Sequence, residues 1–351
     1  YMDSWHKDYI LNKEKYLKLF DDTMQKEQET NVEFLEKSIL NKFHTSRKYA
    51  VAVNNGTDAL QFALISLGIK PGDEVLVSNF SWISTASCIS MIGAVPVFCD
   101  IDISSYHMSL DSIKKMYSNK TKAIIYPHLF GNMSDTIKIK EFCKDIHFIE
   151  DSCQGLGSSL NGVKAGTIGD ISTLSFNANK VVSGIAGGGA ILTDDEEIAN
   201  TIRKLRKHGE NEILGYNSKM LLMNAVIINY RLTKLEEYRI KRQEVAKKYD
   251  KLLKDLVIIQ ETNINLNHNY HKYIIRLKDK ETRDKLKDRL KAKVHYDTPL
   301  SELPMYKNIS HRKDGIANTQ LVCDTILTLP IDPFITDEEI YNTCNIIMAT
   351  V

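Results

Sequence analysis

The stretch HFIEDSCQ, residues 147–154, begins as an apolar run and ends in acidic and polar side chains. Similar runs of about five apolar residues recur between Lys48 and Thr193, and segments with apolar residues at helical spacing separate them. Strands that alternate with helices are typical of crossover connections in a parallel sheet. The sequence therefore predicts an α/β fold with a mostly parallel, seven-stranded sheet sandwiched by helices.

The predicted strands are bounded by turn residues. In the first unit, a strand at residues 49–53 precedes the turn Asn54-Asn55-Gly56, and a helix begins at Thr57 and ends before Gly68. Further strands are predicted at residues 74–78, 94–98, 122–126, 147–150 and 189–193.

The pattern changes after Thr193. Residues 196–207 and 219–256 are rich in lysine, arginine and leucine and are predicted to be helical. A predicted strand at 273–277 and predicted helices at 281–291 and from Asp337 indicate a smaller α+β unit. We therefore expect a large domain at residues 1–235 and a small C-terminal domain at residues 236–351.

The composition excludes several classes of function. Lysine and arginine (46) nearly balance aspartate and glutamate (45), and the net charge of +1 gives no field that would attract nucleic acid. No apolar run approaches the roughly 18 residues that a membrane helix needs. The six cysteines are scattered without a C-x-x-C pair, so we expect no metal site and a reduced, cytoplasmic protein.

Asp151 and Lys180 carry the chemical prediction. A carboxylate at the end of a buried strand is costly unless a cation pairs with it, and the protonated ring nitrogen of pyridoxal 5′-phosphate is such a cation. An amine on a later loop can bind the cofactor's aldehyde as a Schiff base and then transfer protons. Gln154, three residues after Asp151, would bond the ring's phenolic oxygen. Taken singly, the acid could cap a loop and the lysine could simply be solvated.

Other side chains complete a cofactor site. Gly56 allows close approach to a ligand, and the helix that begins at Thr57 offers unpaired N–H groups to a phosphate. Ser175 would add a hydroxyl, and Trp82 could lie flat against the ring. Each of these residues could have an ordinary structural role, but their order along the chain favours a common role in one cofactor site. The sequence therefore predicts a pyridoxal phosphate enzyme that handles amino groups.

Five segments carry a resemblance to a known family, and together they run over nearly the whole chain. They are Gly56-Thr57-Asp58-Ala59-Leu60, Glu150-Asp151-x-x-Gln154-x-x-Gly157, Ser175-Phe176-x-x-x-Lys180, Gly215-Tyr216-Asn217-Ser218-Lys219-Met220 and His295-Tyr296-x-x-Pro299-Leu300. With these segments the chain resembles the DegT/DnrJ-type nucleotide-sugar aminotransferases.

The resemblance implies a specific fold and reaction. The fold would be that of aspartate aminotransferase (fold type I), in a homodimer with shared active sites. Lys180 and Asp151 would be catalytic, and Thr57, Asp58 and Ser175 would hold the phosphate with Asn217 of the other subunit. Glutamate would donate its amino group to a keto group at C3 or C4 of a nucleotide-linked deoxysugar, for surface polysaccharide or O-antigen.

The chain departs from the family pattern at the substrate side. Members generally carry arginine where Lys219 stands, and lysine lacks the bidentate fork that arginine presents to carboxylates. The loop after Lys180 has Gly187 where an acidic residue is usual. Its length, together with His295 and Tyr296, resembles members that act on C3 ketones. We treat Lys219, His295 and Tyr296 as candidate substrate contacts.

Two alternatives remain at this stage. Some relatives remove a hydroxyl from the sugar, but those have histidine in place of the lysine, and this chain has Lys180. A non-catalytic binding or regulatory protein on the same fold would be expected to have lost Lys180 or Asp151, and both are present. A nicotinamide dehydrogenase is disfavoured because no G-x-G-x-x-G follows the first strand.

Overall fold

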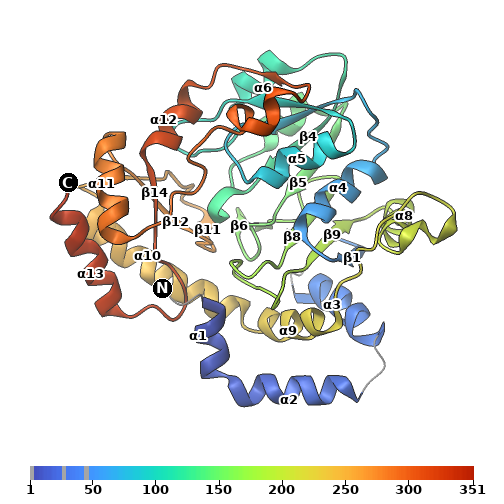
Figure 1. Cartoon of the computed structure of the whole chain (residues 1–351), viewed down its shortest axis with the longest axis horizontal. Coiled ribbons are helices and arrows are strands. Elements are labelled where there is room, and N and C mark those ends of the chain that lie inside the picture. The colour runs from blue at the N-terminus through green and yellow to red at the C-terminus, as the bar shows by residue number, and fades with distance from the viewer. Residues whose placement is uncertain (1–3, 26–28, 43–46) are drawn as a thin grey trace.

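The computed structural model, which describes residues 4–25, 29–42 and 47–351, is built on a central eight-stranded sheet (Figure 1). The strand order is β1-β9-β8-β5-β4-β2-β3-β13. Strand β9 is antiparallel to both of its neighbours, and the remaining pairs are parallel. The strands are β1 (Tyr49–Val53), β2 (Glu74–Ser78), β3 (Val95–Cys99), β4 (Thr121–Pro127), β5 (His147–Asp151), β8 (Ile171–Ser175), β9 (Gly189–Thr193) and β13 (Arg312–Lys313).

The predicted fold class is confirmed, with one more strand than expected. Strands β8 and β13 are not among the six strands that the sequence analysis placed by residue, and β13 pairs in parallel with β3 at the edge of the sheet. It comprises only Arg312 and Lys313, so no apolar run marked it in the sequence.

Helices cover both faces of the sheet because successive side chains of a strand point to opposite faces. In β1, Val51 and Val53 join one core and Ala50 and Ala52 join another. The first core includes Leu60 and Leu64 of α4, and the second includes Leu35 of α3 and Ile228 of α9. The helices of this part are α3 (Glu29–Lys42), α4 (Gly56–Ser66), α5 (Ile83–Met91), α6 (Leu110–Met116), α7 (Ile137–Phe142), α8 (Glu196–Leu205) and α9 (Leu222–Leu232).

Residues 219–256 were predicted to be helical, and most of them are. The structure has two helices there, α9 and α10 (Leu235–Leu253), which meet at Thr233 and Lys234. Neither residue is a glycine or proline, so the break carried no sequence signal.

The C-terminal part has its own sheet and core. Strands β10 (Ile258–Ile259), β12 (Tyr273–Arg276) and β14 (Ile326–Leu329) form three antiparallel strands. Helices α11 (Lys280–Leu290), α12 (Ala317–Thr325) and α13 (Asp337–Met348) belong to this part. The predicted boundary at residues 235 and 236 falls at the start of α10 and stays a prediction.

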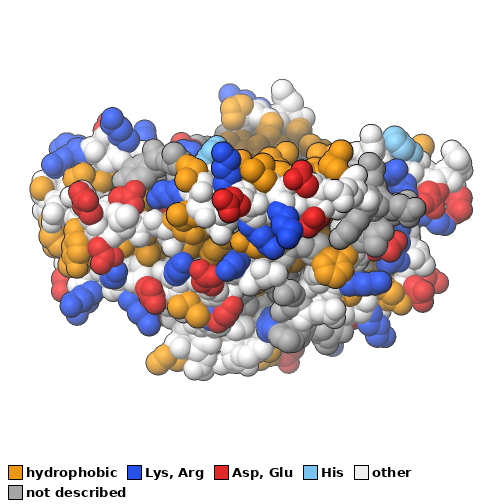
Figure 2. All heavy atoms as spheres, turned by 90° about the horizontal axis from the view of Figure 1, so that it is seen from below, with side chains coloured by type: hydrophobic (Ala, Val, Ile, Leu, Met, Phe, Trp, Pro, Cys, Tyr) orange, Lys and Arg blue, Asp and Glu red, His pale blue; other side chains and the backbone are white. Residues whose placement is uncertain are grey.

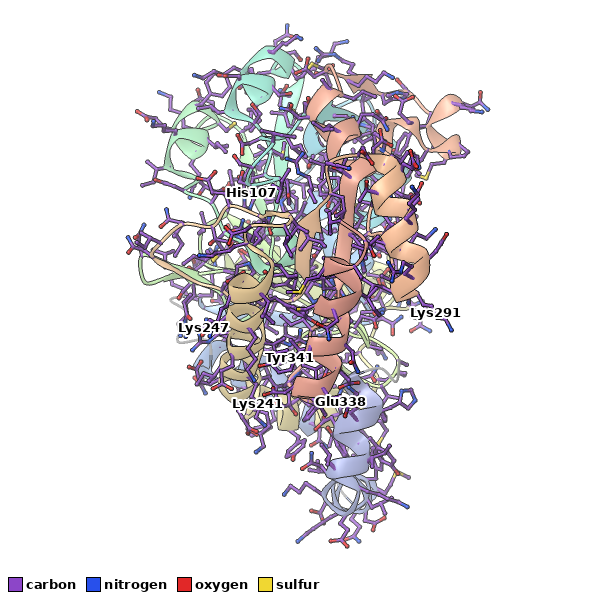
Figure 3. All side chains as sticks on the ribbon, turned by 90° about the vertical axis from the view of Figure 1, so that its left-hand side faces the viewer. His107, Lys241, Lys247, Lys291, Glu338 and Tyr341 are labelled. Carbon is purple, nitrogen blue, oxygen red and sulfur yellow. The ribbon has the colours of Figure 1, made fainter. Side chains whose placement is uncertain are left out.

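Helices α10 and α13 run side by side in this part of the molecule (Figure 3). Lys248 and Asp337 pair between them at 2.5 Å, and the labelled Lys241 and Glu338 lie on their outer surface. The remaining elements are short or N-terminal: α1 (Ser4–Leu11), α2 (Lys13–Met24), β6 (Ser159–Leu160), β7 (Val163–Lys164), β11 (Leu266–Asn267), η1 (Leu129–Gly131), η2 (His208–Asn211), η3 (Leu300–Glu302) and η4 (Pro304–Lys307).

The face of the molecule seen from below (Figure 2) carries no large patch of charges of one sign among the described residues. Basic and acidic side chains are interspersed there (Figure 2), in keeping with the net charge of +1. Among the described residues, no helix is both long enough and apolar enough to span a bilayer.

Candidate functional site

A cavity of about 360 Å³ lies at the carboxyl ends of the parallel strands. Ligands of open α/β sheets bind at this edge, where loops and helix N-termini converge. Nine of the twelve candidate site residues line the cavity: Gly56, Thr57, Trp82, Asp151, Gln154, Ser175, Lys180, His295 and Tyr296. A larger surface hollow of about 660 Å³ lies at the opposite edge, near Lys70 and Lys122, and contains none of them.

One end of the cavity is formed by the N-termini of two helices. The first turn of α4 contributes Gly56 and Thr57, and that of α5 contributes Ser84 and Thr85. The Thr57 and Ser84 hydroxyls are 2.7 Å apart and link the two helix starts. Unpaired N–H groups and the positive end of the helix dipole favour an anion here.

Gly56 is required by the packing of this end. A Cβ atom at Gly56 would lie 2.8 Å from the Cβ of Ser175 and 3.3 Å from Cys153 Sγ. The backbone of α4 can therefore approach the end of β8 only without a side chain at this position. This close approach brings the start of α4 against Ser175 at this end of the cavity.

Asp58 does not line the cavity, and its predicted phosphate contact stays a prediction. Its carboxylate accepts from Ser218 Oγ at 2.6 Å and from Asn55 Nδ2 at 3.0 Å. Its N–H donates to Asn55 Oδ1 at 2.9 Å, which is the N-cap bond of α4. Because these partners occupy the side chain, Asp58 supports the helix start from behind.

Asp151 lies at the floor of the cavity with its carboxylate fixed. Thr85 Oγ1 donates to Oδ2 at 3.1 Å, and the N–H of Cys153 donates to Oδ1 at 3.1 Å. Ser81 Oγ is 2.9 Å from the Thr85 hydroxyl and in turn orients it. The residue is only 6% exposed, so its charge is held where a cationic ligand group could pair with it.

Lys180 shares this cavity with Asp151. Burial of the amino group lowers the pKa of Lys180, although Cys153 and Asp151 act in the opposite direction. A lowered pKa leaves more of the neutral amine, which is the nucleophilic form. The turn that carries the lysine is closed by its own N–H, which donates to Asn177 O at 2.8 Å.

Gln154 and Tyr296 form the side of the cavity toward the C-terminal part. The N–H of Phe130 donates to Gln154 Oε1 at 2.9 Å, and Gln154 Nε2 donates to the Tyr296 hydroxyl at 2.9 Å. The Tyr296 ring stacks on Phe130 at 5.7 Å between ring centroids. Trp82 lies at the rim and is 57% exposed, so its ring is available to a planar ligand.

The structure adds two cationic or titratable residues that sequence reasoning missed, His271 and Lys272. Both lie in the loop immediately before β12, where no motif marked them. Burial lowers the pKa of His271 well below its ordinary value, and burial with Lys272 nearby lowers the pKa of His295 to about 4. Both imidazoles are therefore neutral at physiological pH and can donate or accept hydrogen bonds.

Asn217 and Lys219 lie outside the cavity of this chain. Both are exposed on the segment that follows η2, and neighbouring Leu214 is 95% exposed. The intervening Ser218 is buried and bonds Asp58. The predicted cross-subunit role of Asn217 and the predicted substrate contact of Lys219 stay predictions.

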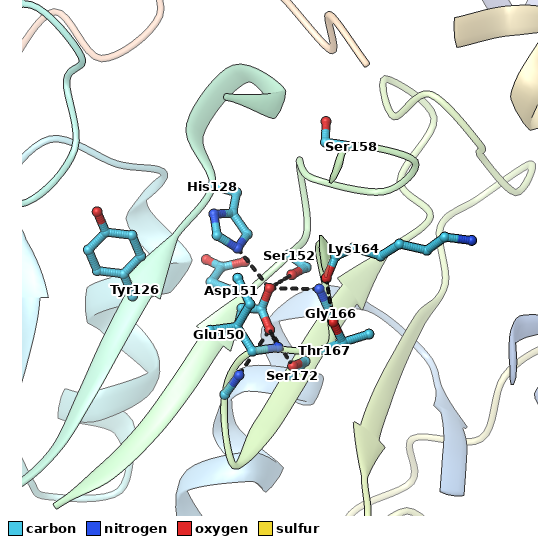
Figure 4. A network of polar contacts seen from close by, with 12 residues as sticks. Tyr126, His128, Glu150, Asp151, Ser152, Ser158, Lys164, Gly166, Thr167 and Ser172 are labelled. Carbon is cyan, nitrogen blue, oxygen red and sulfur yellow. Dashed lines mark hydrogen bonds and ion pairs between the residues drawn. The ribbon is translucent and has the colours of Figure 1, made fainter. Parts of the chain in front are cut away.

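Glu150 precedes Asp151 and anchors the site from within the sheet (Figure 4). Its carboxylate accepts from His128 Nε2 at 2.7 Å and from the N–H groups of Gly166, Ile168 and Gly169 at 2.6–3.1 Å. Burial alone would raise the pKa of Glu150, but the hydrogen bonds and His128 outweigh it and lower the pKa to about 2. This network fixes the strand end from which Asp151 projects.

These features fit pyridoxal 5′-phosphate. The two helix N-termini beside Gly56 suit a phosphate, the buried carboxylate of Asp151 suits a ring cation, and the Lys180 amine suits an aldehyde. No three His, Cys, Asp or Glu side chains within the described ranges are grouped to hold a metal ion.

The sequence profile of the DegT/DnrJ/EryC1/StrS aminotransferase family matches residues 12–348. The chain belongs to this family. The match covers almost the entire chain and confirms the predicted family and enzyme class, since this is a family of aminotransferases.

Two relatives are each 32% identical to the chain. One is a UDP-N-acetyl-3-dehydro-α-D-glucosamine 3-aminotransferase of Acidithiobacillus ferrooxidans, with 86% of this chain and 84% of the relative covered. The other is called a pleiotropic regulatory protein, from Geobacillus stearothermophilus, with 84% and 83% covered.

Solved structures agree with the fold. The NtdA protein of Bacillus subtilis, with the cofactor PMP bound, has a TM-score of 0.83 at 27% identity and covers 96% of this chain and 82% of its own. A GDP-4-keto-6-deoxymannose-3-dehydratase has a TM-score of 0.86 at 23% identity, with 95% and 96% covered. The latter likeness shows the fold alone.

Proposed function

We propose that this protein is a pyridoxal phosphate-dependent aminotransferase that moves the amino group of glutamate onto a keto group of a nucleotide-linked deoxysugar. The observation that carries this proposal is the shared cavity of Lys180 and Asp151 beside the two helix N-termini. Family membership supports the reaction, and the cofactor in the NtdA structure supports the ligand.

Each residue of the site has a proposed role that follows from its position in the cavity. When bound, the cofactor supplies an aldehyde that exchanges amino groups and a ring that withdraws electrons. Asp151 would hold the ring nitrogen protonated, and Lys180 Nζ would bind the aldehyde and carry protons. Gly56, Thr57 and Ser175 would hold the phosphate, and Trp82 would lie against the ring face.

The sugar carbon that receives the amine is C3 or C4. The Acidithiobacillus relative, by its name, acts at C3, and the loop after Lys180 together with His295 and Tyr296 favours the same position. Neutral His271 and His295 at the cavity wall can bond sugar hydroxyls without adding charge. We further propose a cytoplasmic role in making an aminated sugar for surface polysaccharide or O-antigen.

The test is a substrate panel. The purified protein is incubated with pyridoxal phosphate, glutamate and nucleotide-linked 3-keto or 4-keto deoxysugars, and the products are weighed by mass spectrometry. The expected result is replacement of the keto oxygen by an amino group, with release of 2-oxoglutarate. Lys180→Ala is the control and should lose at least about 10³-fold in rate, because one group serves as nucleophile and proton carrier.

Two outcomes would contradict the proposal. Full activity of Lys180→Ala would remove the role of the amine. A sugar product that has lost a hydroxyl, without gaining nitrogen, would instead favour the dehydratase. The regulatory name of the Geobacillus relative raises a non-catalytic alternative, but here Lys180 and Asp151 are both in place.

We propose in addition that the active unit is a homodimer in which each subunit completes the other's site. Asn217 and Lys219 lie outside the cavity of their own chain, on an exposed segment that carries Leu214 and Tyr216. Exposed apolar residues beside unused polar residues are expected of a subunit contact.

Subunit mixing tests the shared site. Lys180→Ala and Asn217→Ala proteins, each inactive or weak alone, are unfolded together and refolded. If Asn217 acts across the interface, mixed dimers regain one intact site, and activity should recover to about a quarter of wild type for random C2 pairing. No recovery from the mixture, with dimers shown by ultracentrifugation, would place both residues in one subunit's site.

A further inference from the structure

The loop between Lys180 and β9 is held by side chains that lie away from the cavity. Arg231 of α9 donates through Nη1 to Ser183 O at 3.1 Å and to Ser183 Oγ at 2.5 Å. Trp5 Nε1 of α1 donates to Gly184 O at 3.1 Å. Asn224 Oδ1 accepts from the N–H groups of Ile185 and Ala186 at 3.0 and 3.2 Å. The loop is thus fixed from its outer side at consecutive residues.

Arg231 is itself held by the N-terminal helices. Arg231 Nε donates to Asp8 Oδ2 at 2.9 Å, and both residues are only 2% exposed. The Asp8 carboxylate also accepts from the hydroxyls of Tyr16 and Tyr238. Arg231 lies over the Trp5 ring at 5.2 Å. A buried ion pair is stable only when further hydrogen bonds satisfy its charges, and these are present.

The tethered loop leads directly into the cavity wall. Ala186, Gly187 and Gly188 line the cavity, and the two glycines have φ values of 128° and 133°. Glycine in such conformations loses more backbone freedom on ordering than other residues. Because ordering these glycines is costly, the conformation of the loop depends on its contacts with other elements.

We propose that Arg231, fixed by Asp8 of α1, is a positioning residue that holds the Lys180 loop in its ligand-binding shape. Helices α1 and α2 lie below α9 and α10 (Figure 1), so the N-terminal segment acts on the site without touching the cavity. Its effect on the cofactor rests on the proposed function, through the role of Lys180. Its effect on the loop does not.

The first measurement is amide hydrogen exchange of residues 181–188 in the full-length protein without cofactor. Arg231→Gln and Asp8→Asn should each raise exchange of this segment about tenfold, the weight of one charge-assisted hydrogen bond. Lys7→Ala is the matched control, because Lys7 lies on the same helix but pairs with Asp332 and Glu339. It should leave exchange of the segment at the wild-type level.

The second measurement is the equilibrium affinity for pyridoxal phosphate and the pH at which absorbance of the bound cofactor changes. Both should shift in Arg231→Gln and not in Lys7→Ala. Unchanged exchange in folded Arg231→Gln, or a rise spread evenly over the whole chain, would overturn the proposal. If Arg231→Gln does not fold, Trp5→Phe, which removes the donor to Gly184 O and changes the ring beneath Arg231, should raise exchange about threefold; no rise there also overturns the proposal.

The two proposals fail differently. Wild-type protein that binds no pyridoxal phosphate would refute the proposed function, while the exchange of residues 181–188 would still decide the role of Arg231.

Discussion

Gln154 and Tyr296 are joined by a 2.9 Å hydrogen bond across 142 positions of the chain. The N–H of Phe130 occupies Gln154 Oε1, so the amide presents its NH₂ group to the Tyr296 hydroxyl. The hydroxyl acts as acceptor in this bond, and its own proton can be donated to another group. The bond thus ties the loop after β5 to the C-terminal part and leaves a donor at the cavity wall.

The first prediction concerns this donor. Tyr296→Phe should raise the KM for the keto sugar about tenfold, as expected for loss of one hydrogen bond, and change the KM for glutamate less. Steady-state kinetics with each substrate varied would measure both values. Tyr341→Phe, at an exposed tyrosine of α13, is the control and should behave as wild type. An unchanged sugar KM in Tyr296→Phe would remove Tyr296 from substrate binding.

The second prediction separates Asp151 from its support. Asp151→Asn should lower kcat about a hundredfold or more, because a preorganised charge beside the reacting group is lost. Thr85→Val keeps the carboxylate and removes the hydroxyl that donates to Oδ2 and contacts Ser81, so the loss should be nearer tenfold. The rates are measured with glutamate in single-turnover experiments. Equal losses in the two variants would mean that orientation, and not charge, decides the rate.

The third prediction concerns the close approach at Gly56. Gly56→Ala should weaken cofactor binding about tenfold or more, because the added Cβ meets Ser175 at 2.8 Å and α4 must move. Gly315→Ala adds a Cβ with no atom within 4 Å and is the matched control. Fluorescence titration with pyridoxal phosphate measures both. Wild-type affinity in Gly56→Ala would show that this end tolerates displacement.

Much of the sheet could be predicted from the sequence because most of its strands are short apolar runs between turn residues; β8, with Ser172, Thr173 and Ser175, is not such a run. Residues 49–53, 74–78 and 189–193 were predicted with the bounds that the structure has. Strand β13 was missed because pairing with β3, and not the character of Arg312 and Lys313, makes it a strand. Whether such a short segment at the edge of a sheet forms a strand depends on its tertiary contacts.

The site, like the sheet, has residues that could be predicted from the sequence and residues that could not. Asp151 and Lys180 could be found because strand ends of a parallel sheet meet at one edge, so residues 29 positions apart in the chain reach one cavity. The turn of Asp58 toward Ser218 depends on a segment 160 positions later, which no local pattern reveals. His271 and Lys272 reach the cavity only through the folding of the C-terminal part over the sheet edge.

The fourth prediction follows from the lowered pKa of Glu150. A carboxyl group whose pKa is lower in the folded state than its ordinary 4.5 stabilises the fold above pH 4.5, and this contribution is lost as the pH falls toward about 2. The shift corresponds to a contribution of Glu150 to the free energy of unfolding on the order of 3 kcal/mol. Chemical denaturation at intervals between pH 2 and pH 5 should therefore show falling stability in the wild type.

Glu150→Gln isolates this contribution. The amide keeps the shape of the carboxylate but cannot accept from His128 and three backbone N–H groups as an anion does, so the variant should be less stable at pH 7. Its stability should also change less between pH 5 and pH 2 than that of the wild type. Glu338→Gln, at an exposed carboxylate of α13, should retain the wild-type slope. Parallel slopes for Glu150→Gln and wild type would show that other carboxylates, and not Glu150, govern the acid transition.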